Sequence, residues 1–408
     1  MAEVRDFTSY ASRFGRGDSD QYDNDTEPSY KERIRNHKIA VVFRTVTIAV
    51  AVVLFVALVY IGWRDKEYSE AVIVEGPSVT NGLDAKVISL KESVVQYSKD
   101  GISCINSSGS VVWNQTYEMQ NPIARTCGSV VAVGDYNGHN IYVSDTTGAL
   151  GKVDTNLPIR DFCVSSQGVV AVVLDGTDVT WIYLYDSKGN TLASFKTTMK
   201  DSGYPIAVSI SPNGELVCVS YLYPEDGAVK TSVAFFNFGS VGQNSVDNYV
   251  SGYDYPGTVV PYVQFMNSGA AFAVSDDRIM FYAGDQKPVS QTEIFTGDEE
   301  IRSIYYDESY VGIVYPNNTS EGTYKLKVYS SQGTEVLTSF FDIDYSEIIF
   351  NNKQLIIYNE DECIIQDMNG HIKYQGAFET PVRLMVPTAI RSKFTLVTTQ
   401  NIQTMNLK

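Results

Sequence analysis

Short apolar and polar segments alternate along residues 83–408. Runs of four to eight apolar residues are separated by Gly, Asn, Asp and Ser, and no long stretch shows the period of a helix. This pattern is typical of β-strands joined by turns. One strand–turn–strand layout recurs in five segments: ISCINSSGSVVWNQTY (102–117), IYVSDTTGALGKV (141–153), IYLYDSKGNTLASF (182–195), KVYSSQGTEVLTSF (327–339) and CIIQDMNGHIKYQGAF (363–378). We therefore expect an all-β domain built from a repeated hairpin.

Two further strand-like segments precede each hairpin. The second of them is rich in Val and Ala, as in VVAVGDY (130–136), and the first ones start near residues 86, 122, 158, 205, 261, 301, 345 and 382. Four short strands per unit, repeated about every 36–56 residues, are typical of a β-propeller. The eight leading strands predict eight blades, and seven blades, with two weak units merged, are the alternative.

The last unit, residues 382–408, shows only three strands. We expect the segment EAVIVEG (70–76) to supply its fourth strand and so to close the ring. In the hairpins an Asp or Ser is followed three residues later by Gly, which suits a tight turn because Gly adopts positive φ without steric cost. The segment 237–257 predicts a longer turn in one blade.

The stretch Thr45–Trp63 carries no charge over 19 residues, which is long enough for a helix to cross a membrane. The apolar run could begin at Ile39. A cleaved signal peptide is the alternative, but a preceding segment of some forty residues and the length of the run disfavour it. We predict an uncleaved helix that contacts membrane lipid.

Basic residues are more frequent before this helix than after it. Five precede it and two follow it: Lys31, Arg33, Arg35, Lys38, Arg44, and Arg64, Lys66. By the positive-inside rule, the N-terminus is cytoplasmic and the C-terminal part is extracellular. The predicted organisation is a disordered tail with a basic stretch (1–38), a transmembrane helix (39–63), a linker with the closing strand (64–82) and a propeller (83–408).

The net charge of −17 argues against a nucleic-acid partner, because phosphates are bound by clustered Lys and Arg. Three scattered histidines and the absence of zinc motifs give no metal site, and the acidic turns are read as solvated turns, with calcium as the alternative. We assign no catalytic residue and no cofactor.

The five cysteines lie in or beside apolar strands, which indicates small buried side chains. One disulfide, between Cys104 and Cys127 of adjacent blades, is the alternative for an exported domain.

The most distinctive surface candidate is the aromatic segment NYVSGYDYPGTVVPY (248–262). We interpret it as a long connection whose tyrosines form a binding rim, because Tyr offers a large contact area at modest entropic cost. Its candidate residues are Tyr249, Tyr253, Tyr255 and Tyr262. Packing inside the fold is the alternative role.

The layout SSGSVVWN, with Gly109 four residues before Trp113, resembles the tryptophan-docking repeat of quinoprotein-type eight-bladed propellers. The equivalent positions in the other four hairpins are Lys152, Ala193, Leu337 and Tyr374, so the resemblance extends to blade architecture and not to quinone chemistry. The order of polar tail, single helix and propeller resembles, over nearly the whole chain, the Gram-positive membrane-protein family catalogued as domain of unknown function 5711. That resemblance implies location and fold.

These patterns favour a non-enzymatic binding or scaffold module, anchored in the membrane, for a protein or cell-wall partner at the cell envelope. The alternative is an envelope enzyme or small-ligand sensor that uses the centre of the propeller. Carboxylates, Arg and Tyr around the centre would favour the alternative, and packing by Val, Ala and Phe would favour the scaffold.

Overall fold

The computed structural model describes residues 30–64, 66–78, 85–177, 179–198, 202–225, 227–297 and 299–408. The chain divides into two compact units, residues 1–66 and 67–408, which are described separately.

The first unit contains one helix, α1 (Tyr30–Arg64). Its segment Ile34–Val59 is long and apolar enough to cross a membrane. Inside that segment the hydroxyls of Thr45 and Thr47 each donate, at 2.8 Å, to the carbonyl oxygen four residues earlier. These polar groups are therefore satisfied within the helix, as an apolar solvent requires.

Helix α1 is longer than the apolar run that predicts it. Thr45 and Trp63 both lie inside it, but it begins at Tyr30 rather than near Ile39. The residues between are mostly Lys, Arg, Glu and other residues that tolerate a helix, so hydrophobicity does not mark its start. Residues 30–38 are thus helical, and the rest of the predicted tail, residues 1–29, lies outside the described residues.

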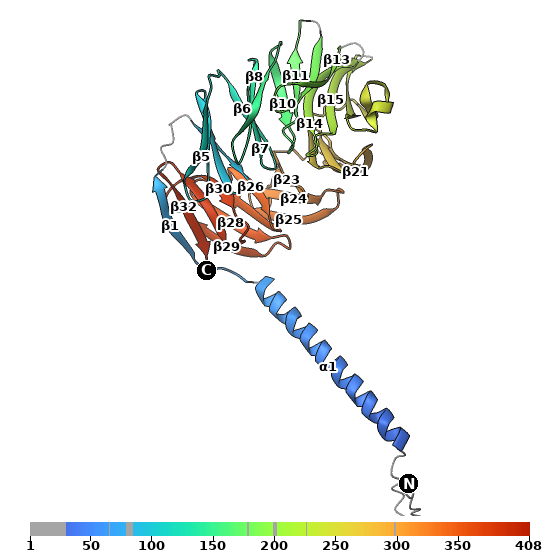
Figure 1. Ribbon diagram of the computed structural model, residues 1–408, viewed down its shortest axis with the longest axis vertical. Helices are drawn as coiled ribbons and strands as arrows, with labels where there is room; N and C mark the ends of the chain where they lie inside the picture. Colours follow the sequence, from blue (N-terminus) through green and yellow to red (C-terminus); the bar gives the residue numbers. More distant parts are fainter. Residues whose placement is uncertain are drawn as a thin grey trace, which may run out of the picture. The chain divides into compact units, whose positions relative to one another are not determined.

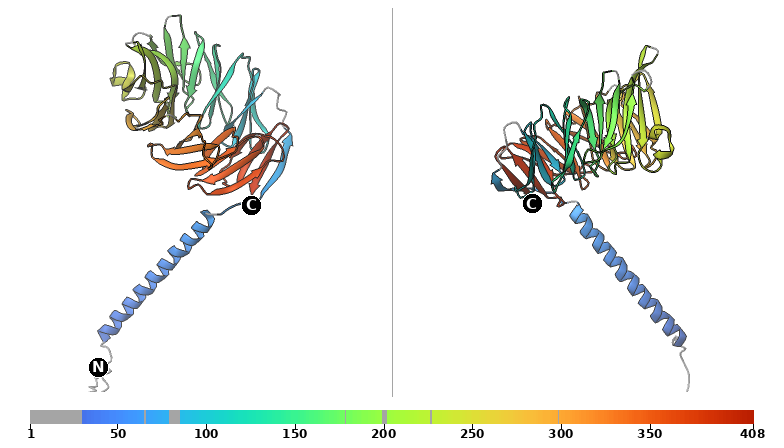
Figure 2. Two further views of the ribbon diagram at one scale, coloured as in Figure 1. Left: turned by 180° about the vertical axis from the view of Figure 1, so that it is seen from behind. Right: turned by 45° about the horizontal axis from the view of Figure 1, so that its top comes forward.

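The second unit is a β-propeller of eight four-stranded antiparallel sheets, counted over the described residues (Figures 1 and 2). Blades 1 to 4 consist of β2 Lys86–Leu90, β3 Ser93–Tyr97, β4 Gly101–Ile105, β5 Val111–Thr116; β6 Pro122–Cys127, β7 Val130–Asp135, β8 Asn140–Asp145, β9 Ala149–Asp154; β10 Ile159–Val164, β11 Val170–Asp175, β12 Thr180–Tyr185, β13 Thr191–Thr197; and β14 Tyr204–Ile210, β15 Leu216–Glu225, β16 Ala228–Asn237, β17 Tyr249–Pro256. Blades 5 to 8 consist of β18 Tyr262–Asn267, β19 Ala270–Val274, β20 Arg278–Ala283, β21 Val289–Phe295; β22 Ser303–Tyr306, β23 Tyr310–Pro316, β24 Tyr324–Ser330, β25 Glu335–Phe341; β26 Glu347–Asn351, β27 Gln354–Tyr358, β28 Glu362–Asp367, β29 Ile372–Ala377; and β30 Val382–Pro387, β31 Lys393–Thr398, β32 Asn401–Leu407, β1 Ala71–Ser78. The predicted fold class and blade count are confirmed.

The five quoted hairpins are the third and fourth strands of their blades. In blade 3 the carboxylate of Asp186 accepts hydrogen bonds from the N–H groups of Lys188 and Asn190, at 2.9 and 2.8 Å. Gly189 adopts a φ of +87° in the same turn. The longer turn predicted within 237–257 holds two short 3₁₀ helices, η1 (Gly242–Asn244) and η2 (Val246–Asn248).

The ring closes as the sequence predicts. β1 pairs with β32 from Ala71 opposite Leu407 to Ser78 opposite Asn401, so the N-terminal strand completes the C-terminal blade. Between blades 8 and 1, the guanidinium of Arg383 donates to the carbonyl of Ala85 at 2.7 Å.

Eight clusters of buried apolar residues hold the blades together, one at each interface between neighbouring blades. The cluster between blades 8 and 1, for example, contains Val94, Ile105, Val386 and Val397. The second strands are almost entirely buried, which explains their Val and Ala content. Because all eight clusters and the closing strand lie within residues 67–408, we expect this unit to fold on its own.

The propeller has two faces. Strand direction alternates in an antiparallel blade, so the turns after the first and third strands share one face, here called face A. The turns after the second strands and the connections between blades share the opposite face, called face B. First strands of neighbouring blades contact each other, for example β10 with β14, and they are therefore the innermost strands.

Candidate functional site

A pocket opens between blades 5 and 6 on face B, with a volume of about 700 Å³. Three segments build it: the connection into β18, the turn after β19, and the connection into β22. The lining residues are Val259, Pro261, Tyr262, Val274, Ser275, Asp276, Glu300, Ile301, Arg302, Ser303 and Ile304.

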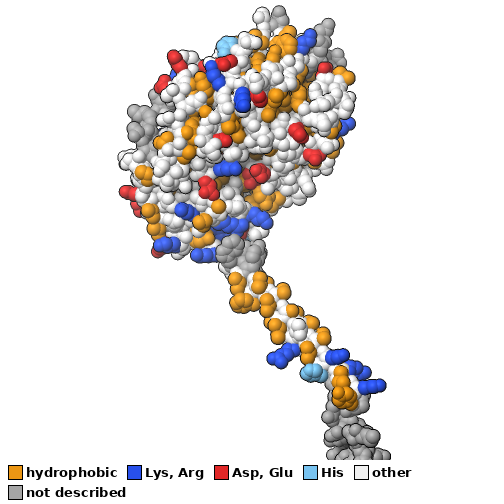
Figure 3. Space-filling model, viewed as in Figure 1, with side chains coloured by type: hydrophobic (Ala, Val, Ile, Leu, Met, Phe, Trp, Pro, Cys, Tyr) orange, Lys and Arg blue, Asp and Glu red, His pale blue; other side chains and the backbone are white. Residues whose placement is uncertain are grey.

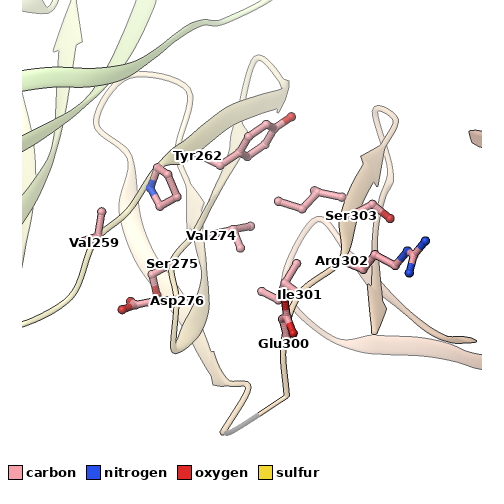
Figure 4. Close-up of a pocket in the computed structure, with 11 residues that line it drawn as sticks. Val259, Tyr262, Val274, Ser275, Asp276, Glu300, Ile301, Arg302 and Ser303 are labelled. Carbon is pink, nitrogen blue, oxygen red and sulfur yellow. The ribbon is translucent and has the colours of Figure 1, made fainter. Parts of the chain in front are cut away.

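The walls of the pocket are mainly apolar. Figure 4 shows the side chains of Val274 and Ile301 on opposite sides of the cavity, with Asp276 and Glu300 at its edge. Ile301 and Ile304 pack against the buried cluster shared by blades 5 and 6. An apolar surface that is held in place by the core therefore lies beside two carboxylates.

Neither Asp276 nor Glu300 forms an ion pair with another described residue, and both are exposed. The neighbouring Asp277 differs, because its two oxygens accept hydrogen bonds from Arg278 at 2.9 and 2.7 Å. Hydrogen bonding to Arg278 lowers the pKa of Asp277. The positive charge nearest the turn is thus already neutralised, and Asp276 is left with an unpaired charge.

The one guanidinium among the lining residues is directed elsewhere. Arg302 lies over the ring of Tyr324, 4.9 Å from its centroid, and Figure 4 shows it pointing away from the cavity. The hydroxyl of Ser303 is hydrogen-bonded to that of Tyr345 at 2.6 Å. The pocket therefore offers negative charge and apolar surface to a ligand.

A second polar group lies on the innermost strands. Arg125 of β6 donates to Asp161 of β10 at 3.1 Å. Burial raises the pKa of Tyr262 well above its usual value and that of Tyr306 to about 12, while the positive charge of Arg125 lowers both. Arg125 belongs to blade 2 and the tyrosines to blades 5 and 6, so the charge of Arg125 acts on both hydroxyls across the middle of the ring.

Glu347 at the start of β26 is a further innermost carboxylate. Burial raises its pKa to about 7. Burial also raises the pKa of Tyr305 and Tyr358 on neighbouring strands, and the charge of Glu347 adds to both shifts. The side chain is nevertheless accessible to solvent. A side chain that faces the centre of the ring is surrounded by protein on all sides and still touches solvent. Glu347 shows both properties, so we place it at the centre of the ring.

The structure separates the four tyrosines predicted to form one rim. Segment 248–262 is mostly the fourth strand of blade 4, β17, rather than a loop. Tyr255 is buried and hydrogen-bonded to Tyr282 at 2.7 Å, and the hydroxyl of Tyr253 donates to the carbonyl of Pro288 at 3.2 Å. β17 carries aromatic residues on both faces, so its sequence does not alternate between aliphatic and polar residues as a typical strand does. In sequence it therefore resembles an aromatic loop.

The other two tyrosines line different pockets. Tyr249 is 48% exposed and borders a groove of about 880 Å³ between blades 3 and 4. Tyr262 lines the pocket between blades 5 and 6. Tyr262 is thus the predicted residue that the structure brings to the candidate site.

The cysteines are free, so the alternative of a Cys104–Cys127 disulfide is wrong. Cys104 packs in the cluster between blades 1 and 2, whereas Cys127 packs in the cluster between blades 2 and 3. Blade 2 therefore separates them. Burial raises the pKa of all five thiols, for example to about 12 for Cys363, which makes them poor nucleophiles.

Groups of His, Cys, Asp and Glu that could hold a metal ion are not found in the described part of the chain. His139 and His371 lie in turns, as predicted, and Nδ1 of His139 is 3.0 Å from the carbonyl oxygen of Thr155. Trp113 packs at the interface of blades 1 and 2.

The model of the family of unknown function DUF5711 matches residues 64–407. The chain belongs to this family. The search of curated proteins found no match.

Solved structures similar to the chain are propellers. The C-terminal WD40 domain of Sif2 has a TM-score of 0.52 at 12% identity, covering 83% of this chain and 98% of that domain. BamB from Moraxella catarrhalis has a TM-score of 0.47 at 12% identity, covering 83% of this chain and 100% of that protein. At such identities the likeness to Sif2 shows the fold alone.

Sequence reasoning did not find Asp276 and Glu300, the charged residues at the edge of the pocket. The chain carries 48 Asp and Glu residues, and nothing in the local sequence distinguishes these two. Their positions relative to the strands could have identified them, but only after the strands are assigned. Asp276 then follows a second strand and Glu300 precedes a first strand, which puts both on face B.

Proposed function

We propose that this chain is a single-pass membrane protein whose propeller is a non-enzymatic binding module at the cell envelope. Its ligand is a protein or cell-wall component that presents a positive charge next to apolar groups. Two features support the anchor and the module: the apolar segment Ile34–Val59, and a propeller unit that is complete without the residues before it. A rigid disc with loops on two faces is well suited to recognition, and tethering raises its effective concentration at the membrane.

The observation that carries this proposal is the pair of unpaired carboxylates, Asp276 and Glu300, beside the apolar walls of the pocket. A cation that enters the pocket gains an ion pair without breaking an existing one. An anionic ligand would be repelled by these two carboxylates and by a protein of net charge −17. The pocket therefore favours lysine-like, arginine-like or amine groups with an apolar portion.

A second function, a small-ligand sensor or envelope enzyme that uses the middle of the ring, is favoured by the innermost side chains. Arg125, Asp161, Tyr306 and Glu347 are polar and at least partly accessible, rather than the Val, Ala and Phe that a plugged centre would show. Binding of an anionic small molecule that is lost in Arg125→Gln and kept in Asp276→Asn would favour this function over the first.

The proposed orientation places residues 1–29 in the cytoplasm and residues 67–408 outside the cell. It is supported by the excess of basic residues before the apolar segment. Protease added to intact cells is expected to digest residues 67–408 and to leave an N-terminal fragment protected by the membrane. Digestion only after cell lysis would contradict this orientation.

The pocket is tested by the double variant Asp276→Asn/Glu300→Gln. A short peptide of alternating lysine and leucine is the probe, and fluorescence anisotropy measures its binding to residues 67–408. The Kd is expected to rise about tenfold, since each partly exposed ion pair contributes up to about 1 kcal/mol.

The matched control is Glu118→Gln/Glu379→Gln, which removes the same charge from exposed connections on face B outside the pocket. Its Kd should change by less than about twofold, because distant surface charges are screened in physiological salt. An equal loss of affinity in both double variants would show general electrostatic attraction and would contradict a specific pocket.

A further inference from the structure

Three neighbouring turns on face A form one continuous surface. They follow the first strands of blades 7, 8 and 1. The side-chain amide of Asn351, the strand residue just before the first turn, donates to the carbonyl of Thr388 in the second, at 3.4 Å. The backbone N–H of Ala389 in the second turn donates to the carboxylate of Glu92 in the third, at 2.9 Å. The three turns are therefore joined by hydrogen bonds.

This surface is basic, although the chain as a whole is acidic. Its cations are Lys91, Lys353, Arg391 and Lys393, and its one carboxylate, Glu92, is the hydrogen-bond acceptor just described. The equivalent turns of the other five blades carry no Lys or Arg, and their charged residues are Glu215, Asp307 and Glu308. Among the turns that follow first strands, Lys and Arg are thus confined to one sector of face A; the turns that follow third strands add Lys188 and Lys287 elsewhere on this face, each with an Asp in the same turn. Figure 3 shows Lys and Arg side chains gathered along the part of the propeller that holds the C-terminus in Figure 1.

Two of these lysines occupy backbone positions that disfavour lysine. Lys91 has a φ of +54° and Lys353 a φ of +61°. Two-residue turns of this kind are usually made by Asn, Asp or Gly, which adopt positive φ at lower cost. The lysines therefore cost conformational energy, and turn formation does not account for them. Their charge does.

An apolar side chain stands among the cations. Ile390, in the turn of blade 8, is 60% exposed. An exposed aliphatic residue surrounded by lysines matches the boundary of a membrane, where the cations meet phosphate groups and the aliphatic group enters the acyl region.

Face A is also the face at which the chain enters the propeller. Ala71, the first residue of β1, lies opposite Leu407. The N–H of Leu407 donates to the carbonyl of Ser392, in the turn of blade 8, at 2.8 Å. The anchoring segment therefore leads in the chain to the face that carries the basic surface.

We propose that this basic surface, formed by Lys91, Lys353, Ile390, Arg391 and Lys393, docks on an anionic lipid bilayer. The proposal rests on the proposed membrane anchor for its biological setting, but the binding itself does not need the helix. The acidic residues of face B do not prevent it. They lie a strand length away, about 15–20 Å, and the Debye length in physiological salt is about 8 Å.

The experiment measures sedimentation of residues 67–408 with vesicles. One set contains phosphatidylglycerol and phosphatidylcholine in a ratio of one to two, and the other contains phosphatidylcholine alone. The wild-type fragment is expected to bind the anionic vesicles and not the neutral ones. The variant Lys91→Asn/Lys353→Asn should bind the anionic vesicles about 25-fold more weakly, since each basic residue near such a surface contributes a factor of about five.

The same substitutions should raise the thermal stability of the fragment or leave it unchanged, because Asn adopts positive φ more readily than Lys. A loss of binding through unfolding is thereby excluded. The matched control, Lys99→Asn in an exposed turn of face B, should bind like the wild type. Ile390→Ser should weaken binding to anionic vesicles further when added to the double variant.

Equal binding of the wild type and the Lys91→Asn/Lys353→Asn variant would overturn the proposal. So would equal binding to neutral and anionic vesicles, or binding to soluble polyphosphate without binding to vesicles. Failure of the proposed anchor or of the pocket is distinguishable, because neither the helix nor Asp276 and Glu300 take part in this assay.

Discussion

A chain that begins at residue 85, and therefore lacks β1, is expected to aggregate and to lose cooperative unfolding. A chain that begins at residue 67 is expected to fold and to stay in solution after cell lysis. The two chains differ by the closing strand, by the segment that leads from it into blade 1, and by residues 67–70, where the N–H of Tyr68 donates to the carbonyl of Lys373 at 2.8 Å. The comparison therefore isolates ring closure from membrane anchoring.

The expected loss comes from both the backbone and the core. β1 pairs with β32 at six residue positions, and Ile73 and Ala71 pack against the cluster between blades 7 and 8. At about 1 kcal/mol per net hydrogen bond, with the burial of Ile73 added, the loss is about 5 kcal/mol. That equals much of the total stability of about 5–15 kcal/mol that a folded domain has. Without β1, the edge of β32 is also exposed for pairing with other chains.

The measurement is urea unfolding followed by tryptophan fluorescence, together with size-exclusion chromatography. A monomeric, cooperatively unfolding chain from residue 85 would show that three strands suffice in blade 8, and the role given to β1 would be wrong. An insoluble chain from residue 67 would contradict the claim that this unit folds on its own.

Replacement of Phe272 by Ala is expected to lower the free energy of unfolding by about 4 kcal/mol, as is usual when a buried Phe leaves a cavity. Phe272 is completely buried in β19. Its ring lies 5.7 Å from that of Tyr262, 5.8 Å from that of Tyr306 and 6.4 Å from that of Phe281, measured between centroids. The residue therefore supports both the interface of blades 5 and 6 and a wall of the candidate pocket.

Phe295→Ala is the matched control, because Phe295 is 67% exposed at the end of β21. It gives up a contact with Arg278, which lies 4.5 Å from its ring centroid, and should cost at most about 1 kcal/mol. Urea unfolding gives both values. Equal losses in the two variants would mean that the interface of blades 5 and 6 is not the packed core described.

The propeller could be predicted from sequence because its repeat unit is local. The sequence of each blade contains its own strand periodicity and turn residues, as around Gly189. Eight copies of this pattern together indicate the fold, although each copy alone is weak evidence. The closing strand could be predicted because a unit with three strands leaves an unpaired edge. The start of α1 could not, since the residues from Tyr30 to Lys38 are compatible with a helix but are not apolar.

The candidate site was less accessible to prediction. Asp276 lies in a turn of blade 5 and Glu300 in the connection from blade 5 to blade 6, and their proximity depends on how far those blades separate at face B. The aromatic residues around Tyr255 suit either a loop or a strand between two cores, so the sequence predicts a binding rim where the structure has the strand β17. Only Tyr262 of the four tyrosines lines the pocket between blades 5 and 6, since its strand is the innermost one of blade 5.

The pairing of Ala71 with Leu407 also determines the order of events during synthesis. β1 is among the first strands of the propeller to leave the ribosome, but its partner is among the last residues made. At about 5–20 residues per second, β1 waits tens of seconds for that partner. Throughout that time the first strand has an open edge, and a nascent chain that stops before residue 405 lacks the partners of Ala71, Val72 and Ile73.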